Sequence, residues 1–165
     1  MPVNPIPDGY HSVTPYLFIS GAADAIAFYE KAFDATELFR LPSPDGKVMH
    51  AEIRIGNSHV MLADAMEEFD VKSPSTLGGT TGSLMIYVDD ADALFQQAIN
   101  AGATEAKPME DQFWGDRMGA LIDPFGHQWS IATHVEDVAE DEMAKRFEAM
   151  MKEMGPGCGR QFTHP

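Results

Sequence analysis

Hydrophobic and polar positions in the first half of the chain predict one strand, one helix and three further strands. Residues 13–19 are rich in β-branched and aromatic side chains and predict the first strand, although Pro15 cannot donate to a ladder and belongs near a strand end. Turn-forming stretches separate three later segments, residues 36–41, 47–55 and 58–63, which predicts antiparallel strands. Between the first strand and these three segments, a helix is predicted over residues 22–33 from the helical spacing of Ala22, Ala25, Ile26, Tyr29 and Phe33.

The second half of the chain repeats this order. The pattern predicts a strand over residues 83–88, a helix over 90–101 with Asp89 or Asp90 as its N-cap, and strands near Glu105, over 118–122 and over 127–133. Ala35-Thr36-Glu37 recurs as Ala103-Thr104-Glu105, which supports an internal repeat. The predicted fold class is therefore α+β, with two βαβββ modules that form a curved open-barrel sheet around a cavity.

The predicted domain organisation is a single domain over residues 1–135, with module one at 13–64 and module two at 83–134. Residues 64–82 lack a sustained apolar period and predict the connection between the modules. A docking helix is predicted over residues 136–154, because Ala139, Met143, Phe147 and Met151 form one stripe. Residues 155–165 are predicted to be a flexible tail.

The charge balance disfavours two classes of partner. With 11 Lys and Arg against 26 Asp and Glu, the net charge of -15 would repel a phosphate backbone or an anionic membrane surface. We therefore expect a small-molecule ligand, with no nucleic-acid or membrane partner. The charge fits either simple solubility or an acidic cleft that attracts cations.

Two further features bear on the compartment. The sequence shows no export signal and no apolar run of membrane-spanning length. Cys158 is the only cysteine and cannot form an intrachain disulfide, which fits a reducing environment. The expected location is the cytoplasm.

Several motifs point to a known family. They are Val13-Thr14-Pro15-Tyr16-Leu17, Ala25-Ile26-Ala27-Phe28-Tyr29, His50-Ala51-Glu52, Trp114-Gly115-Asp116-Arg117 and Asp123-Pro124-Phe125-Gly126-His127-Gln128-Trp129. Over about residues 13–142 the chain resembles the vicinal oxygen chelate superfamily of glyoxalases, bleomycin resistance proteins and dioxygenases, and more closely its PhnB-like branch. The resemblance implies a ligand cavity built from the paired modules.

In metal-dependent members such as glyoxalase I, the resemblance implies one metal ligand on the first strand and one on the last strand of each module. The corresponding positions here are Thr14 and Ser83 on the first strands, and Val60, to within one residue, and Ser130 on the last strands. Hydroxyl groups and an aliphatic side chain are poor ligands for divalent first-row metals. We therefore expect no metal and no cofactor, which counts against glyoxalase I and extradiol dioxygenase chemistry.

The third strand carries the predicted catalytic residues. Its apolar set is Met49, Ala51, Ile53 and Ile55, and its polar set is His50, Glu52 and Arg54. Strand alternation places the apolar set toward the helices and the polar set toward the cavity. His50 and Glu52 are predicted to transfer a proton or form a polar platform, with Arg54 as a ligand-binding residue. The alternative is a solvent-facing stripe in which Arg54 pairs with Glu52.

The remaining predicted ligand-binding residues lie mostly in module two. Trp114 and Asp116 precede the corresponding strand there, where an aromatic face and a carboxylate suit a planar or cationic group. Alternatively, Trp114 caps the core and Asp116 pairs with Arg117. Strand parity adds Thr14, Tyr16, Ser83, Tyr87 and Ser130 as cavity-facing candidates. His127, in a Pro- and Gly-containing turn, is expected to be structural.

Three functions remain open from the sequence. The first is a small-molecule-binding protein or a metal-independent enzyme with an unknown substrate, and the second is a drug-sequestering protein that binds cations without chemistry. The third is a metal-dependent lyase or dioxygenase that uses unusual ligands such as His50, His59 and Asp64. We also expect a homodimer, because paired modules leave sheet edges and apolar faces for a partner to cover.

Overall fold

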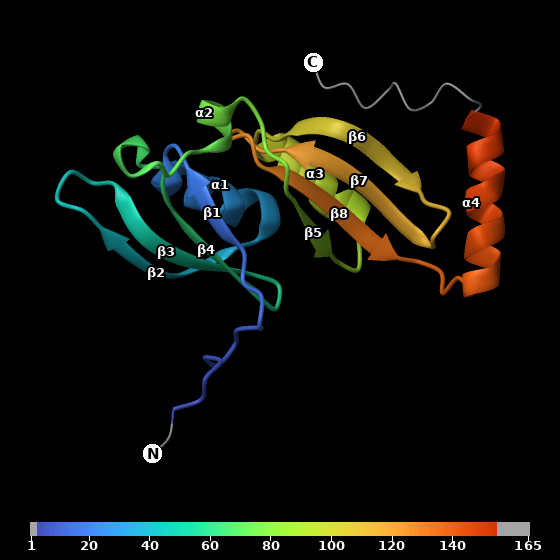
Figure 1. Ribbon diagram of the computed structural model, residues 1–165, viewed down its shortest axis with the longest axis horizontal. Helices are drawn as coiled ribbons and strands as arrows, with labels where there is room; N and C mark the ends of the chain where they lie inside the picture. The colour runs from blue at the N-terminus through green and yellow to red at the C-terminus, as the bar shows by residue number, and fades with distance from the viewer. Residues whose placement is uncertain (1–2, 155–165) are drawn as a thin grey trace.

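A computed structural model describes residues 3–154 of the chain and has the predicted order of elements (Figure 1). Module one contains β1 (Tyr16–Ile19), α1 (Ala22–Phe33), β2 (Thr36–Pro42), β3 (Val48–Ile55) and β4 (Ser58–Asp64). Module two contains β5 (Ser83–Tyr87), α3 (Ala91–Ala101), β6 (Thr104–Asp111), β7 (Asp116–Ile122) and β8 (Gln128–His134), and α4 (Glu140–Met154) follows. The predicted flexible tail, with Cys158, lies outside the described residues.

Each module forms one curved four-stranded sheet, in the orders β1-β4-β3-β2 and β5-β8-β7-β6. The first strand pairs parallel to the last strand of its own module, and the other pairs are antiparallel. In the parallel pairs Tyr16 lies beside Met61 and Met85 lies beside Ser130. The α+β fold class with two βαβββ modules is confirmed.

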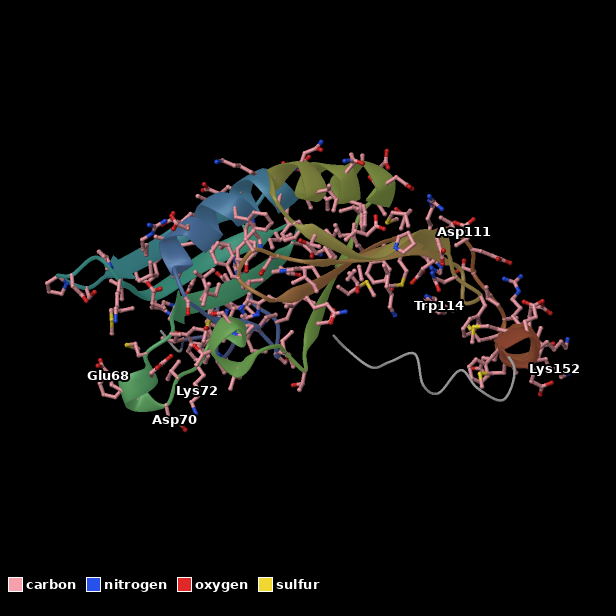
Figure 2. The ribbon with its side chains drawn as sticks, turned by 90° about the horizontal axis from the view of Figure 1, so that it is seen from above. Glu68, Asp70, Lys72, Asp111, Trp114 and Lys152 are labelled. Carbon is pink, nitrogen blue, oxygen red and sulfur yellow. The ribbon has the colours of Figure 1, made fainter. Side chains whose placement is uncertain are left out.

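One face of each sheet packs against a helix. Figure 2 shows α1 and α3 on the same side of the two sheets. All five residues of the predicted α1 stripe are buried. In module two, the strand residues Leu121, Trp129 and Ile131 belong to the same buried core as the helices. The two helices contact each other, because the side-chain amide of Gln97 donates to the Lys31 carbonyl at 3.0 Å and to Asp34 at 2.9 Å. The opposite side of each sheet is not covered by α1 or α3 and is called its open face below.

A buried carboxylate joins the two modules. Asp123, in the turn between β7 and β8, is 3% exposed and accepts hydrogen bonds from the Tyr29 hydroxyl of α1 at 2.7 Å and the Trp129 indole at 2.9 Å. Its other oxygen accepts from the backbone N–H groups of Phe125 and His127, both at 2.9 Å. His127 itself is buried, which lowers the pKa of its imidazole. These contacts agree with a structural role for the turn.

The helix N-termini are capped in two ways. Asp90 caps α3 by accepting from the Ala93 N–H at 3.0 Å, as predicted. Gly21 precedes α1 and has no side chain to serve as a cap. Asp64 of β4 replaces that cap by accepting from the N–H groups of Gly21 and Ala22, both at 2.9 Å. Asp64 also accepts from the Val48 N–H at 2.7 Å, so it holds α1 and β3 to β4.

In module one and the connection, the structure differs from the sequence prediction in the following ways. β1 begins at Tyr16, so Pro15 precedes the strand and contributes only its carbonyl, which accepts from the Met61 N–H at 2.9 Å. The connection contains two short helices, η1 (Glu67–Phe69) and α2 (Pro74–Leu77). The expectation that Met49 faces the helices is wrong. Leu41 of β2 pairs with His50, and the next residue, Pro42, pairs with Val48, so Met49 has no partner on β2 and lies in a bulge. Met49 is 43% exposed and Val48 takes the buried position.

α4 begins at Glu140, four residues later than predicted, and lies beyond the far end of module two (Figure 1). The Phe147 ring packs 5.6 Å from the Phe113 ring, and Arg146 pairs with Glu136 at 2.8 Å and Glu142 at 3.1 Å. Phe147 and Met151 remain about half exposed, so much of the predicted apolar stripe is open. Within residues 3–154, no helix is both long and apolar enough to cross a membrane.

Candidate functional site

The open face of module one carries a polar cluster around Glu52. Strand pairing places Glu52 opposite Met61 and Arg54 opposite His59, on the side away from the buried Ala51 and Ile53. The His50 imidazole lies between two partners, with Nε2 3.1 Å from Glu52 and Nδ1 3.0 Å from the Tyr16 hydroxyl. Tyr10 donates from its hydroxyl to the second oxygen of Glu52. We call Tyr10, Tyr16, His50, Glu52 and His59 the module-one cluster.

The hydrogen bonds of this cluster stabilise a charged Glu52. The bond from Tyr10, opposed by partial burial and helped by His50, lowers the pKa of the Glu52 carboxyl below its ordinary value. The predicted pairing of His50 with Glu52 is present, whereas Arg54 does not take the place of His50 as the partner. His50, Glu52 and Tyr16 can therefore act as a hydrogen-bonding platform on the sheet.

The open face of module two carries a second polar cluster, around Asp116. This carboxylate is 4% exposed and accepts from the Tyr87 hydroxyl at 2.9 Å and from the Trp114 indole at 3.0 Å. Its other oxygen lies 2.8 Å from Nδ1 of His134 on β8. We call Tyr87, Trp114, Asp116 and His134 the module-two cluster. Figure 2 shows Trp114 at the end of module two that is nearest α4.

The alternative pairing of Asp116 with Arg117 is wrong. Arg117 lies on the helix side and pairs with Asp92 of α3 at 2.5 Å and with Asp111 at 3.1 Å. Side chains alternate along β7, so Arg117 and Asp116 lie on opposite faces of the sheet, and Asp116 bonds Tyr87 and Trp114 instead. Burial raises the pKa of Asp116, but the hydrogen bonds from His134, Tyr87 and Trp114 together lower it by more. The pKa of Asp116 therefore lies below its ordinary value.

His134 was missed as a site residue by the sequence reasoning. It lies on the same face of β8 as Ser130, four residues earlier, so strand parity could have found it. Its Nδ1 bonds Asp116, and its Nε2 lies 3.0 Å from the exposed Asp137. The bond to Asp116, and then that to Asp137, raises the pKa of the half-exposed His134 above its ordinary value.

Replacing Asp116 with asparagine should lower the pKa of His134, since the negative charge that favours the imidazolium is removed. An NMR titration of the imidazole protons measures this change directly. Asp137→Asn serves as the matched control and should produce the smaller fall, because Asp137 is fully exposed and its charge is screened by solvent. An unchanged His134 pKa in Asp116→Asn would contradict the assigned bond.

A cleft of about 870 Å³ lies between the modules. Its walls come from the β3–β4 hairpin, from the segment before β1 and from β5. Four predicted ligand-binding residues line it: Thr14, Arg54, Ser83 and Tyr87. Six predicted site residues do not line it: Tyr16, His50, Glu52, Trp114, Asp116 and Ser130.

The cleft nevertheless borders both clusters. His59 lines it from module one and packs its ring 4.3 Å from the Tyr10 ring, while Tyr87 lines it from module two and donates to Asp116. No hydrogen bond described for residues 3–154 joins one cluster to the other. The structure therefore divides the single predicted site into two clusters beside one cleft.

The positions implied for metal ligands do not fit a metal ion. The β1–β4 register identifies Met61, and not Val60, as the counterpart of Ser130, because Met61 pairs with Tyr16 as Ser130 pairs with Met85. Val60 is buried on the opposite face, beside Ile53. The four positions are thus Thr14, Met61, Ser83 and Ser130. A thioether and three hydroxyls lack the imidazole, carboxylate or thiolate donors that nickel, zinc or iron sites use.

The alternative metal site at His50, His59 and Asp64 is also disfavoured by geometry. Both oxygens of Asp64 are occupied by backbone N–H groups of α1 and β3. Among residues 3–154, no group of three or more His, Cys, Asp or Glu side chains is arranged to hold a metal ion. Asp64 therefore serves as a structural cap.

Comparison with known proteins defines the family. Residues 10–131 match the model of the Glyoxalase/Bleomycin resistance protein/Dioxygenase superfamily. An uncharacterized protein of Mycobacterium tuberculosis is 46% identical over 149 residues, which span 88% of this chain and 85% of the relative. The chain belongs to the glyoxalase/bleomycin resistance protein/dioxygenase superfamily.

Solved structures share the fold. Protein PA1353 from Pseudomonas aeruginosa is 25% identical with a TM-score of 0.61, over 76% of this chain and 99% of that protein. The PhnB protein from Bacillus cereus is 18% identical with a TM-score of 0.58, over 74% of this chain and 99% of that protein. At that identity the second similarity concerns the fold alone.

Proposed function

We propose that the chain is a small-molecule-binding protein whose ligand enters the cleft between the modules without a metal at the superfamily's usual positions. The observation that carries this proposal is that one cleft borders both clusters, through His59 and Tyr87. Its volume suits a drug-sized molecule, and its aromatic and polar walls suit oriented binding. The family motifs, including Trp114-Gly115-Asp116-Arg117, favour the PhnB-like branch within this proposal.

A second candidate function is a metal-independent enzyme that transfers protons. The Asp116–His134 pair favours it, because a buried carboxylate that bonds one imidazole nitrogen orients the ring and increases its basicity. His50 and Glu52 form a similar, more exposed pair in module one. A drug-sequestering role would use the same cleft without any proton transfer, and the net charge of -15 suits cationic compounds.

The proposed functional form is a homodimer. Tyr16, Phe39 and Leu41 on module one and Met85 and Tyr87 on module two are each between 43% and 59% exposed. Exposed apolar side chains clustered on a sheet face favour coverage by a partner. A second copy placed against the open faces would cover both clusters and enclose the cleft.

Calorimetry with planar aromatic amines and phenols tests the proposal. We expect at least one compound to bind, and to bind equally after dialysis against a chelator, because the cleft supplies the contacts. Light scattering of the same sample should give a mass near twice 18.1 kDa. Mass spectrometry of the recovered compound separates the candidates, since an unchanged compound supports sequestration and a converted one supports an enzyme.

The opposite results are equally specific. A protein purified without chelator that holds one equivalent of nickel, zinc or iron, and loses it in His50→Ala or Glu52→Ala, would overturn the metal-independent proposal. Binding by a monomer would overturn the dimer and leave the binding function in place.

A further inference from the structure

The segment before β1 reaches the module-one cluster with one aromatic side chain. We call residues 3–15 the arm. Residues 3–9 are exposed and without regular structure, and Figure 1 shows this part of the chain extending away from the sheets. Tyr10 is half-buried and is followed by exposed residues 11–13. The arm therefore meets the cluster mainly through Tyr10.

Tyr10 contacts the module-one cluster through both its hydroxyl and its ring. Its hydroxyl donates to Glu52 and its ring packs 4.3 Å from the His59 ring at an interplanar angle of 50°. Gly9 lies directly on His59, since a Cβ placed there would be 2.6 Å from the imidazole Cε1. Nδ1 of His59 is buried without a hydrogen-bond partner among the described residues. The imidazole is thus covered by the arm without being satisfied by it.

We infer that Tyr10 occupies a binding site for a phenol, formed by Glu52 and His59, and that a phenolic ligand displaces the arm from it. This inference rests on the proposed small-molecule function and names the ligand class of that site. A carboxylate accepts strongly from a phenolic O–H, and an imidazole face packs well on an aromatic ring. His59 also lines the cleft, so a ligand larger than the tyrosine side chain extends from this site into the cleft.

The chemistry selects a neutral hydrogen-bond donor. Burial, the bond to Glu52 and the charge of Glu52 raise the pKa of Tyr10 to about 12, so the hydroxyl remains protonated and donates at neutral pH. A phenolate would place a second negative charge beside Glu52, which also has a lowered pKa. Phenols with ordinary pKa values fit the site, and acidic phenols that ionise near neutral pH do not.

The probe for this site is 4-methylphenol, which is the tyrosine side chain as a free molecule. Tyr10→Ala should bind it at least about tenfold more tightly than the wild type, because the wild-type site is available only in the fraction of molecules with the arm displaced. NMR shifts should centre on Glu52 and His59. Tyr10→Phe keeps the ring but loses the bond to Glu52, so its affinity should fall between the two and decides the question if Tyr10→Ala does not fold.

Two controls define the chemical class. Toluene lacks the hydroxyl and should bind Tyr10→Ala more weakly than 4-methylphenol, and Glu52→Gln added to Tyr10→Ala should weaken 4-methylphenol binding. Equal affinity of 4-methylphenol for the wild type and both Tyr10 variants, or equal affinity for toluene, overturns the inference. If other compounds still bind in the cleft, the proposed function survives that failure; if no compound binds any variant, both fail.

Discussion

Replacing Asp123 with alanine should lower the free energy of unfolding by roughly 3–5 kcal/mol, because a buried acceptor of several hydrogen bonds is lost. The substitution leaves the Tyr29 hydroxyl, the Trp129 indole N–H and two backbone N–H groups without their acceptor. It also removes the bond between α1 of module one and the turn of module two. Urea unfolding at neutral pH measures the loss.

Two variants show whether the hydrogen bonds cause that loss. Asp123→Asn keeps the size of the side chain and one acceptor oxygen, so it should lose less stability than Asp123→Ala. Asp89→Ala removes an exposed carboxylate at the end of β5 and should change the free energy of unfolding by no more than about 0.5 kcal/mol. An Asp123→Ala protein as stable as Asp89→Ala would show that the turn does not hold the modules together.

Much of the fold follows from periodicity, since burial repeats every two residues along strands and three to four along helices. The α1 stripe and the alternation of Ala51, Ile53 and Ile55 were predicted for this reason, and all are buried. Periodicity does not reveal an inserted residue. Met49 continues the apolar alternation, yet a bulge turns it outward, because bulges depend on how the partner strand pairs.

The counterpart of Ser130 was displaced by one residue for a related reason. The β3–β4 hairpin closes on Ile55 and Ser58, with Ile55 buried, whereas the β7–β8 hairpin closes on Ile122 and Gln128, with Ile122 42% exposed. The two hairpins thus begin their last strands on opposite faces. Counting residues from Gly56 and Gly126 cannot detect this difference between the hairpins, whereas the register of the parallel strands reveals it.

The candidate site was predicted in part. Strand parity placed His50, Glu52 and Tyr16 on one open face and Tyr87 on the other, as the structure has them. Asp116 was chosen as a residue preceding the strand of module two, and the structure makes it the first residue of β7, bonded to Tyr87. Tyr10 and His134 were missed as partners of the two carboxylates. The contact of Tyr10 with Glu52 joins residues 42 apart, and no local pattern determines such a contact. His134 could have been predicted from strand parity, because it lies on the same face of β8 as Ser130.

Gly115→Ala should be the most damaging glycine substitution near the module-two cluster. Gly115 has a φ of +96°, and a Cβ there would lie 2.0 Å from the Glu136 carbonyl oxygen and 3.0 Å from its carbon. Both atoms are backbone, so the chain after β8 must move, and the bonds from the N–H groups of Val135 and Glu136 to the Gly115 carbonyl are lost. We expect a loss of roughly 3 kcal/mol or more in the free energy of unfolding.

Gly56→Ala separates this steric effect from the cost of the backbone angle. Gly56 also has a positive φ, +57°, but a Cβ there meets no atom within 4 Å, so the expected loss is only about 1–2 kcal/mol. Because Gly115 lies between Trp114 and Asp116, displacement of its loop should also break the indole bond to Asp116 and change the near-UV circular dichroism, which Gly56→Ala should preserve. Equal losses of stability in the two variants, with unchanged spectra, would mean that the chain after β8 does not pack on Gly115 and that the module-two cluster is not held from that side.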